Sequence, residues 1–172
     1  MKRILCLLLA LCMLLPVVAM AEEAATAKLG VAYAAGHGNG VMVASVVVVD
    51  GVIVDAYIDE IYFTGAKDEY VLLPYASELG VKDEVTTVAI SKRENHEVYS
   101  KSMVDRGGLD IADSYDIYQA FVIGKTIEEL EAAVEGYNAE NKTEFVDVVS
   151  GVTMVDTLFY INALLAAAHN AQ

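Results

Sequence analysis

Cysteine, tryptophan, proline and basic residues are all scarce in this chain of 172 residues. It has no tryptophan, two prolines and two cysteines, and its 11 lysines and arginines stand against 25 acidic residues, for a formal net charge of −14. So acidic a surface repels phosphate backbones and anionic lipid headgroups. The composition therefore predicts no nucleic-acid partner and no binding to an anionic membrane surface.

Apolar residues are concentrated at the amino end of the chain. Residues 1–21 begin with Lys2 and Arg3, continue as an apolar run that Pro16 interrupts, and end in small residues up to Ala21. A basic start, an apolar run and small residues are the three parts of a secretory signal peptide, which predicts cleavage after Ala21. A retained membrane anchor is the alternative, but the run is short for a bilayer span and contains a proline.

Cleavage at this point would leave an exported chain without cysteine. It would exclude a disulfide, a thiol nucleophile and Cys-based zinc or iron–sulfur sites. Nine of the 11 basic residues would remain against all 25 acidic ones, a formal charge of −16. We divide the chain into a signal peptide at 1–21, a polar leader at 22–28 and one domain at 29–172. We expect the mature chain to be secreted to the extracytoplasmic cell envelope, with no stable membrane insertion.

The patterns in the remaining residues predict a single α+β domain, in which an antiparallel sheet built on a central β-hairpin packs with three or four helices. The hairpin is predicted at residues 41–61, where two β-prone runs flank Asp50-Gly51, a strong turn signal. Further strands are predicted at 85–91 and 144–149, and helices at 69–79, 115–123, 126–137 and 154–168. Thr126 and Glu129 have the spacing of a capping box, which marks a helix start. Residues 91–101 are charged and are interpreted as a solvated turn.

Conventional catalytic and metal-binding patterns are weak in this sequence. The three histidines, His37, His96 and His169, do not share a metal-ligand spacing. Asp59 and Glu60 are adjacent acids, and neighbouring side chains on a strand point to opposite faces. We interpret them as solvated residues rather than as an acid–base pair. The sequence therefore predicts neither a metal site nor a catalytic constellation.

One segment stands out, Asp147-Val-Val-Ser150-Gly151-Val152-Thr153, which directly precedes an amphipathic helical pattern. It resembles the flavinylation motif of the FMN-binding domain family, Asp-x-x-(Ser/Thr)-Gly-Ala-Thr. The resemblance implies that Thr153 carries FMN through a phosphoester bond. It also implies that Asp147, Ser150 and Gly151 are recognition positions for the enzyme that attaches the flavin. Val152 departs from the usual alanine.

The resemblance extends to the hairpin turn at 50–59 and to segments 91–103 and 115–126, which are similar to secreted Gram-positive members of the family. Other members are flavin subunits of sodium-pumping NADH:quinone reductases and of Rnf complexes. The resemblance implies a covalent FMN cofactor, a dedicated flavin transferase for maturation, and electron exchange with a membrane quinone oxidoreductase or another redox protein. It therefore predicts an extracytoplasmic electron carrier without a substrate pocket of its own.

Other interpretations of the same residues stay open. Thr153, three residues before Asp156, also has the pattern of an ordinary helix N-cap. The domain would then be a secreted binding or structural domain without flavin, and a flavin enzyme that reduces a small acceptor is a third interpretation. Aromatic residues that either pack in the core or lie near the cofactor are Tyr115, Tyr118, Phe121, Phe159 and Tyr160.

Overall fold

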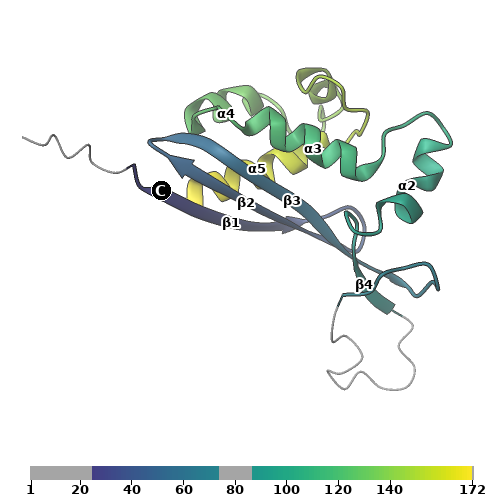
Figure 1. Ribbon diagram of the computed structural model, residues 1–172. Coiled ribbons are helices and arrows are strands. Elements are labelled where there is room, and N and C mark those ends of the chain that lie inside the picture. The colour runs from purple at the N-terminus through teal and green to yellow at the C-terminus, as the bar shows by residue number, and fades with distance from the viewer. Residues whose placement is uncertain (1–24, 74–86, 172) are drawn as a thin grey trace, which may run out of the picture.

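A four-stranded antiparallel sheet, in the strand order β1-β2-β3-β4, carries helices on one face (Figure 1). The structure is a computed structural model that describes residues 25–73 and 87–171. The strands are β1 (Ala27–Ala35), β2 (Gly40–Val49), β3 (Val52–Gly65) and β4 (Thr87–Ser91). The helices are α2 (His96–Val104), α3 (Ile111–Val122), α4 (Ile127–Val134) and α5 (Thr157–Asn170), with a 3₁₀ helix, η1 (Glu144–Val148). The predicted α+β class, with its antiparallel sheet and four helices, is confirmed.

The central hairpin joins β2 and β3 as the sequence predicts. Asp50 and Gly51 both have positive φ, 50° and 80°, and Val49 pairs with Val52 across the turn. Positive φ at both central residues is the type I′ geometry, whose twist matches that of the flanking strands. The Asp-Gly pair therefore sets the register of the two longest strands.

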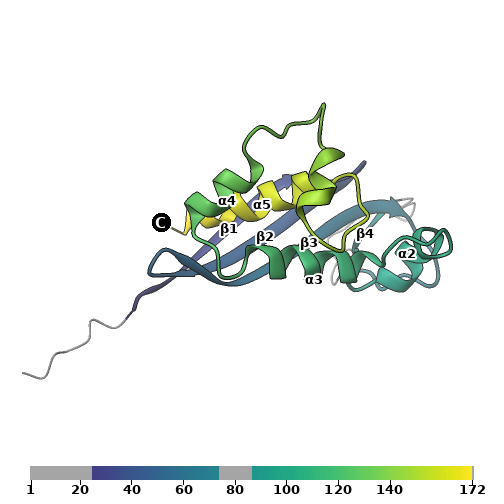
Figure 2. The ribbon, with the colours of Figure 1, turned by 90° about the horizontal axis from the view of Figure 1, so that it is seen from above.

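Alternate residues of the central strands face the helices and form the core. On β2 these are Met42, Ala44, Val46 and Val48, all nearly or fully buried. In Figure 2, α3, α4 and α5 lie on the same side of the sheet. Helix α5 packs against β1 and β2, and α3 packs against β3. The other side of the sheet has no covering helix among the described residues, and Tyr33 on β1 is 73% exposed.

Gly30 lies where α5 comes closest to β1. A Cβ at this position would lie 1.9 Å from the carbonyl oxygen of Ala167 and 2.7 Å from the backbone nitrogen of Ala171. Since both are backbone atoms, the helix would have to move. We expect Gly30→Ala to lower the free energy of unfolding by about 1–3 kcal/mol, as overpacked cores do. Urea unfolding measures this, with outward-facing Val31→Ala as the control; equal stabilities of the two variants would contradict the close approach.

Several predicted boundaries need correction. The strand predicted at 144–149 is the 3₁₀ helix η1, and the helix predicted at 154–168 begins only at Thr157. Residues 69–73 are not helical, and the rest of the helix predicted at 69–79 lies outside the described residues. The solvated turn predicted at 91–101 is a turn only at 92–95, where Lys92 and Asn95 are buried; Ser91 ends β4 and α2 begins at His96. No helix in the described ranges has the length and apolar character needed to cross a bilayer.

The two helices on either side of Gly124 begin with side-chain caps. The capping box of Thr126 and Glu129 is present at α4, as predicted. At α3, the Asp110 carboxylate accepts a hydrogen bond from the Ala112 backbone N–H at 2.8 Å. Gly124, with φ of 86°, follows the end of α3 and donates its N–H to the carbonyl of Ile53 on β3. This turn therefore ties the two helices to the hairpin.

The Asp110 carboxylate, which caps α3, also forms a hydrogen bond with His96. His96 Nδ1 lies 3.0 Å from Asp110 Oδ2, and this hydrogen bond raises the pKa of His96 above its ordinary 6.5. A raised folded pKa adds stability below pH 6.5 that is lost as the pH rises through the folded value. Because the side chain is 40% exposed, solvent limits this contribution to less than about 1 kcal/mol. NMR titration of the ring, and urea unfolding of His96→Gln at pH 5.5 and 8.5, measure it; an unshifted titration would contradict the pairing.

Candidate functional site

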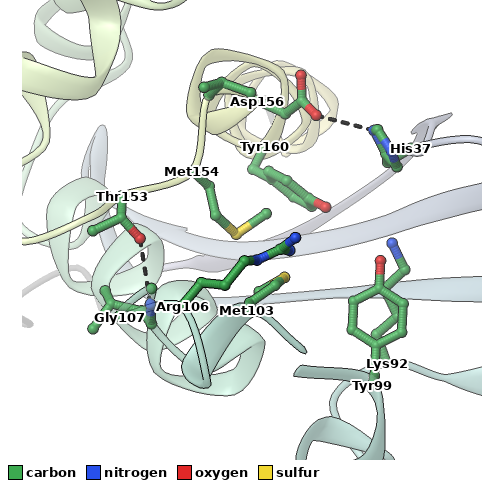
Figure 3. A pocket seen from close by; sticks show the side chains of 13 residues that line it. His37, Lys92, Tyr99, Met103, Arg106, Gly107, Thr153, Met154, Asp156 and Tyr160 are labelled. Carbon is green, nitrogen blue, oxygen red and sulfur yellow. Dashed lines mark hydrogen bonds and ion pairs between the residues drawn. The ribbon is translucent and has the colours of Figure 1, made fainter. Parts of the chain in front are cut away.

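A cavity of about 510 Å³ opens between the amino end of α5 and the carboxyl end of α2 (Figure 3). Its walls come from the loop after β1, the end of β4, helix α2 with the turn that follows it, the segment before α5, and α5 itself. The lining residues are His37, Lys92, Tyr99, Met103, Arg106, Gly107, Gly108, Leu109, Thr153, Met154, Val155, Asp156 and Tyr160. Its volume is in the range of ligand-binding pockets. The sequence did not indicate this cavity, because five separate segments build it.

Thr153 is exposed at the rim of this cavity, in the segment between η1 and α5. Its Oγ1 accepts one hydrogen bond, 3.3 Å long, from the backbone N–H of Leu109. The preceding Gly151 has a φ of 95°, which a side chain would strain, and Val152 is buried in the core. The glycine therefore turns the chain and the valine anchors it, so that the Thr153 hydroxyl is presented to solvent.

The other residues of the sequence motif lie outside the cavity. Asp147 is exposed on η1, and Ser150 and Gly151 are exposed in the turn that follows. Val152 is 8% exposed and packs with the hydrophobic core. Of the five motif residues, only Thr153 lines the cavity. Asp147 and Ser150 are therefore accessible on the surface that leads to the threonine.

Thr153 does not cap α5, so the N-cap interpretation of this residue is wrong. The helix begins at Thr157. Its N-cap residue is Asp156, whose side chain makes no capping hydrogen bond. The Asp156 carboxylate instead pairs with His37 at 3.1 Å and with Lys142. The Thr153 hydroxyl is thus four residues ahead of the helix.

Glu60 and Lys92 form a buried ion pair beside the cavity. Lys92 Nζ lies 2.8 Å from Glu60 Oε1, and the two side chains are 1% and 0% exposed. The Tyr160 hydroxyl donates a hydrogen bond to Glu60 Oε2 at 2.7 Å, and the Lys92 backbone N–H donates to the Glu60 carbonyl. The interpretation of Glu60 as a solvated acid is therefore wrong. Asp59 is buried as well, on the opposite face, where it accepts a hydrogen bond from the Ser91 hydroxyl.

Gly36, in the loop after β1, and Gly40, the first residue of β2, make room for this carboxylate. A Cβ at Gly40 would lie 1.8 Å from Glu60 Oε1, and one at Gly36 would lie 2.5 Å from the same atom. The aromatic rings of Tyr62 and Tyr99 lie 4.9 Å and 4.5 Å from the Lys92 ammonium. Glycines and aromatic residues therefore enclose a charge pair that the local sequence gives no reason to expect.

Three tyrosines pack together in the core, and one of them also lines the cavity. Tyr115, Tyr118 and Tyr160 are all fully buried, and the rings of Tyr118 and Tyr160 are stacked 5.3 Å apart. Burial raises the pKa of Tyr118 to about 12 and also raises the pKa values of the other two phenols. Of the five aromatic candidates, only Tyr160 lines the cavity, and Phe121 and Phe159 are partly buried against the core. Most of these rings are therefore core residues.

A cationic side chain from the turn after α2 lines the cavity. Arg106, in the turn after the helix, extends toward the middle of the cavity (Figure 3). It forms no ion pair within residues 25–73 and 87–171, whereas the cavity's one acidic lining residue, Asp156, pairs with Lys142 and contacts the His37 ring. The cavity therefore has a net positive character although the chain as a whole is strongly acidic.

Comparison with protein families, with curated proteins and with solved structures finds no match for this chain. In the described part of the chain, no group of three or more His, Cys, Asp or Glu side chains is placed to hold a metal ion. The residues of the cavity itself are therefore the basis for a functional proposal.

Proposed function

We propose that this protein is an extracytoplasmic electron carrier that holds FMN covalently, through a phosphoester bond to Thr153 Oγ1. The observation that carries the proposal is the position of Thr153, which has an exposed hydroxyl at the rim of a cavity of about 510 Å³. The motif leading to this residue resembles that of the FMN-binding domain family. The hydroxyl has no role in capping α5, so its presence there is not explained by helix formation.

The residues around Thr153 fit a phosphate and a planar ring. The Arg106 guanidinium lines the same cavity and can pair with a phosphate, which an acidic chain would otherwise repel. Gly107 and Gly108 leave the backbone beside it open to close approach. Tyr99, Met103 and Met154 supply aromatic and thioether surface for a ring. The site thus offers a cation near the attachment point and apolar walls beyond it.

In this proposal, the cofactor supplies the redox chemistry and the chain supplies the tether, the position and the electrostatics. FMN, when bound, can accept and pass on one or two electrons. Residues of the cavity wall would shield one part of the ring from water while the open side leaves it accessible to a redox partner. The acidic surface would steer the protein to basic docking sites on a membrane quinone oxidoreductase or another redox protein.

The exposed turn also suits a maturation enzyme. A flavin transferase must reach the Thr153 hydroxyl, and this residue, Gly151, Ser150 and Asp147 are all exposed. We propose that the transferase recognises this stretch before the flavin enters the cavity. Secretion to the cell envelope, as the residues at 1–21 predict, would place this step outside the cytoplasm.

Intact mass spectrometry tests the proposed function. The full chain is produced together with a flavin transferase and an FMN supply, and its mass is compared with that of the chain produced alone. We expect an added mass of one FMN less one water, and a modified peptide that contains Thr153. An unmodified chain would contradict the proposal and favour the alternative, a secreted binding or structural domain without flavin.

A further inference from the structure

The ammonium group of Lys92 is buried in the cavity wall with unused hydrogen-bonding capacity. A lysine ammonium has three N–H donors, and its 2.8 Å contact with Glu60 Oε1 is an ion pair without hydrogen-bond geometry. Nζ has no hydrogen-bond acceptor in the described part of the chain. A buried donor left unsatisfied is costly, which favours a role for this ammonium beyond packing.

The two residues of the ion pair lie at different distances from the cavity. Lys92 and Tyr160 line the cavity, and the polar ends of these two side chains point toward one another (Figure 3). Glu60 does not line it and is fully buried behind them, where the Tyr160 hydroxyl holds its second oxygen. Lys92 is therefore the member of the pair in the cavity wall, with its Nζ covered from solvent, and Glu60 is the member on the core side.

Tyr62 and Tyr99 keep the cation in this orientation. Their rings meet edge to face, 5.8 Å apart, and both lie within 5 Å of Lys92 Nζ. Cation–π attraction favours the charged ammonium here although water is excluded. Because the pair is excluded from water, the field of this cation is screened less than that of an exposed lysine.

We propose that Lys92, held by Glu60, is a positioning residue that stabilises negative charge on the flavin ring in the cavity, and so raises the reduction potential of the flavin. This inference rests on the proposed function, because it takes the ring to be the occupant of the cavity. Two-electron reduction makes the ring richer in electrons, so a fixed cation stabilises the reduced form more than the oxidised form. The field of the Lys92 ammonium would act on a ring in the cavity, because Glu60, its counter-charge, does not line the cavity.

The test is the reduction potential of the FMN-loaded full chain. Lys92→Met/Glu60→Gln removes both charges together, which leaves no unpaired buried charge and keeps an acceptor for Tyr160. We expect its preference for reduced over oxidised flavin to fall by about tenfold, which is a potential about 30 mV more negative for a two-electron couple. Dithionite titration against a reference dye measures it. Lys92→Gln/Glu60→Gln provides a second charge-free pair should the first variant not fold.

A matched control comes from helix α2, which begins four residues after Lys92. Lys101→Met/Asp105→Asn removes an exposed ion pair of α2 that does not line the cavity, again with no change in net charge. We expect the potential of this control to equal that of the wild type. Equal potentials for the Lys92 double variants and the wild type, with the FMN adduct present in all, would overturn this inference and leave the proposed function standing. Absence of the adduct from the wild type would overturn both.

Discussion

Thr153→Val will give a chain without covalent flavin when it is produced with a flavin transferase, while Thr153→Ser will keep the adduct. Valine has the shape of threonine but no hydroxyl, so a phosphoester cannot form. The native Oγ1 makes one exposed hydrogen bond of 3.3 Å, to Leu109 N. Its loss should therefore change the free energy of unfolding by less than about 0.5 kcal/mol. Intact mass and flavin absorbance of the folded chains give the result directly.

Thr143→Val is the matched control for this substitution. Thr143 is an exposed threonine just before η1, and its side chain makes no capping hydrogen bond. We expect this variant to carry the same adduct as the wild type. If the adduct persists in Thr153→Val, the assignment of the acceptor is wrong. Peptide mapping would then show whether the exposed Ser150 hydroxyl, three residues earlier, carries the flavin instead.

The parts of this fold that could be predicted from the sequence are those that local interactions determine. Asp50 and Gly51 specify a hairpin turn by their own backbone preferences. Thr126 and Glu129 satisfy each other's backbone donors within a single turn of helix. In both cases the interacting residues are at most three positions apart, so a short window of sequence contains the whole interaction.

The parts that could not be predicted depend on contacts between distant segments. Lys92 stands in a charged run that is typical of a solvated turn, yet its partner Glu60 lies 32 positions earlier on β3. The helical pattern from 154 likewise does not show that α5 begins only at Thr157, after Asp156, whose carboxylate contacts His37 and Lys142 from other segments. These contacts override the local preference of each residue, and a single sequence gives no sign of them.

The cavity combines a residue that a local motif indicates with residues that only long-range contacts bring together. Thr153 could be singled out from the motif around it, because its neighbours are adjacent in the sequence. Tyr99, Arg106 and Tyr160, which complete the cavity around it, come from elements that only the fold brings together. A residue in a local motif is thus easier to single out than the residues that complete a cavity around it.

Removing one partner of the buried pair of Lys92 and Glu60 should destabilise the chain more than removing one partner of an exposed ion pair, because it leaves an unpaired buried charge. We expect Lys92→Met alone to lower the free energy of unfolding by about 3–5 kcal/mol, because it leaves a carboxylate with no cation inside the protein. Lys92→Met/Glu60→Gln should recover most of that loss, since no charge remains to be desolvated. Urea unfolding of the chain without flavin measures both variants.

The comparison of single and double variants separates charge from packing. If Lys92 acted only by filling space, the double variant would be at least as unstable as the single one. If the ion pair is what matters, the single variant is the less stable of the two, and Lys101→Met on the exposed face of α2 changes stability by less than about 0.5 kcal/mol. The chain would then hold a charge pair whose removal as a unit costs little. A pair that contributes little to stability as a unit is better explained by the cation that it presents to the cavity than by the folding of the domain.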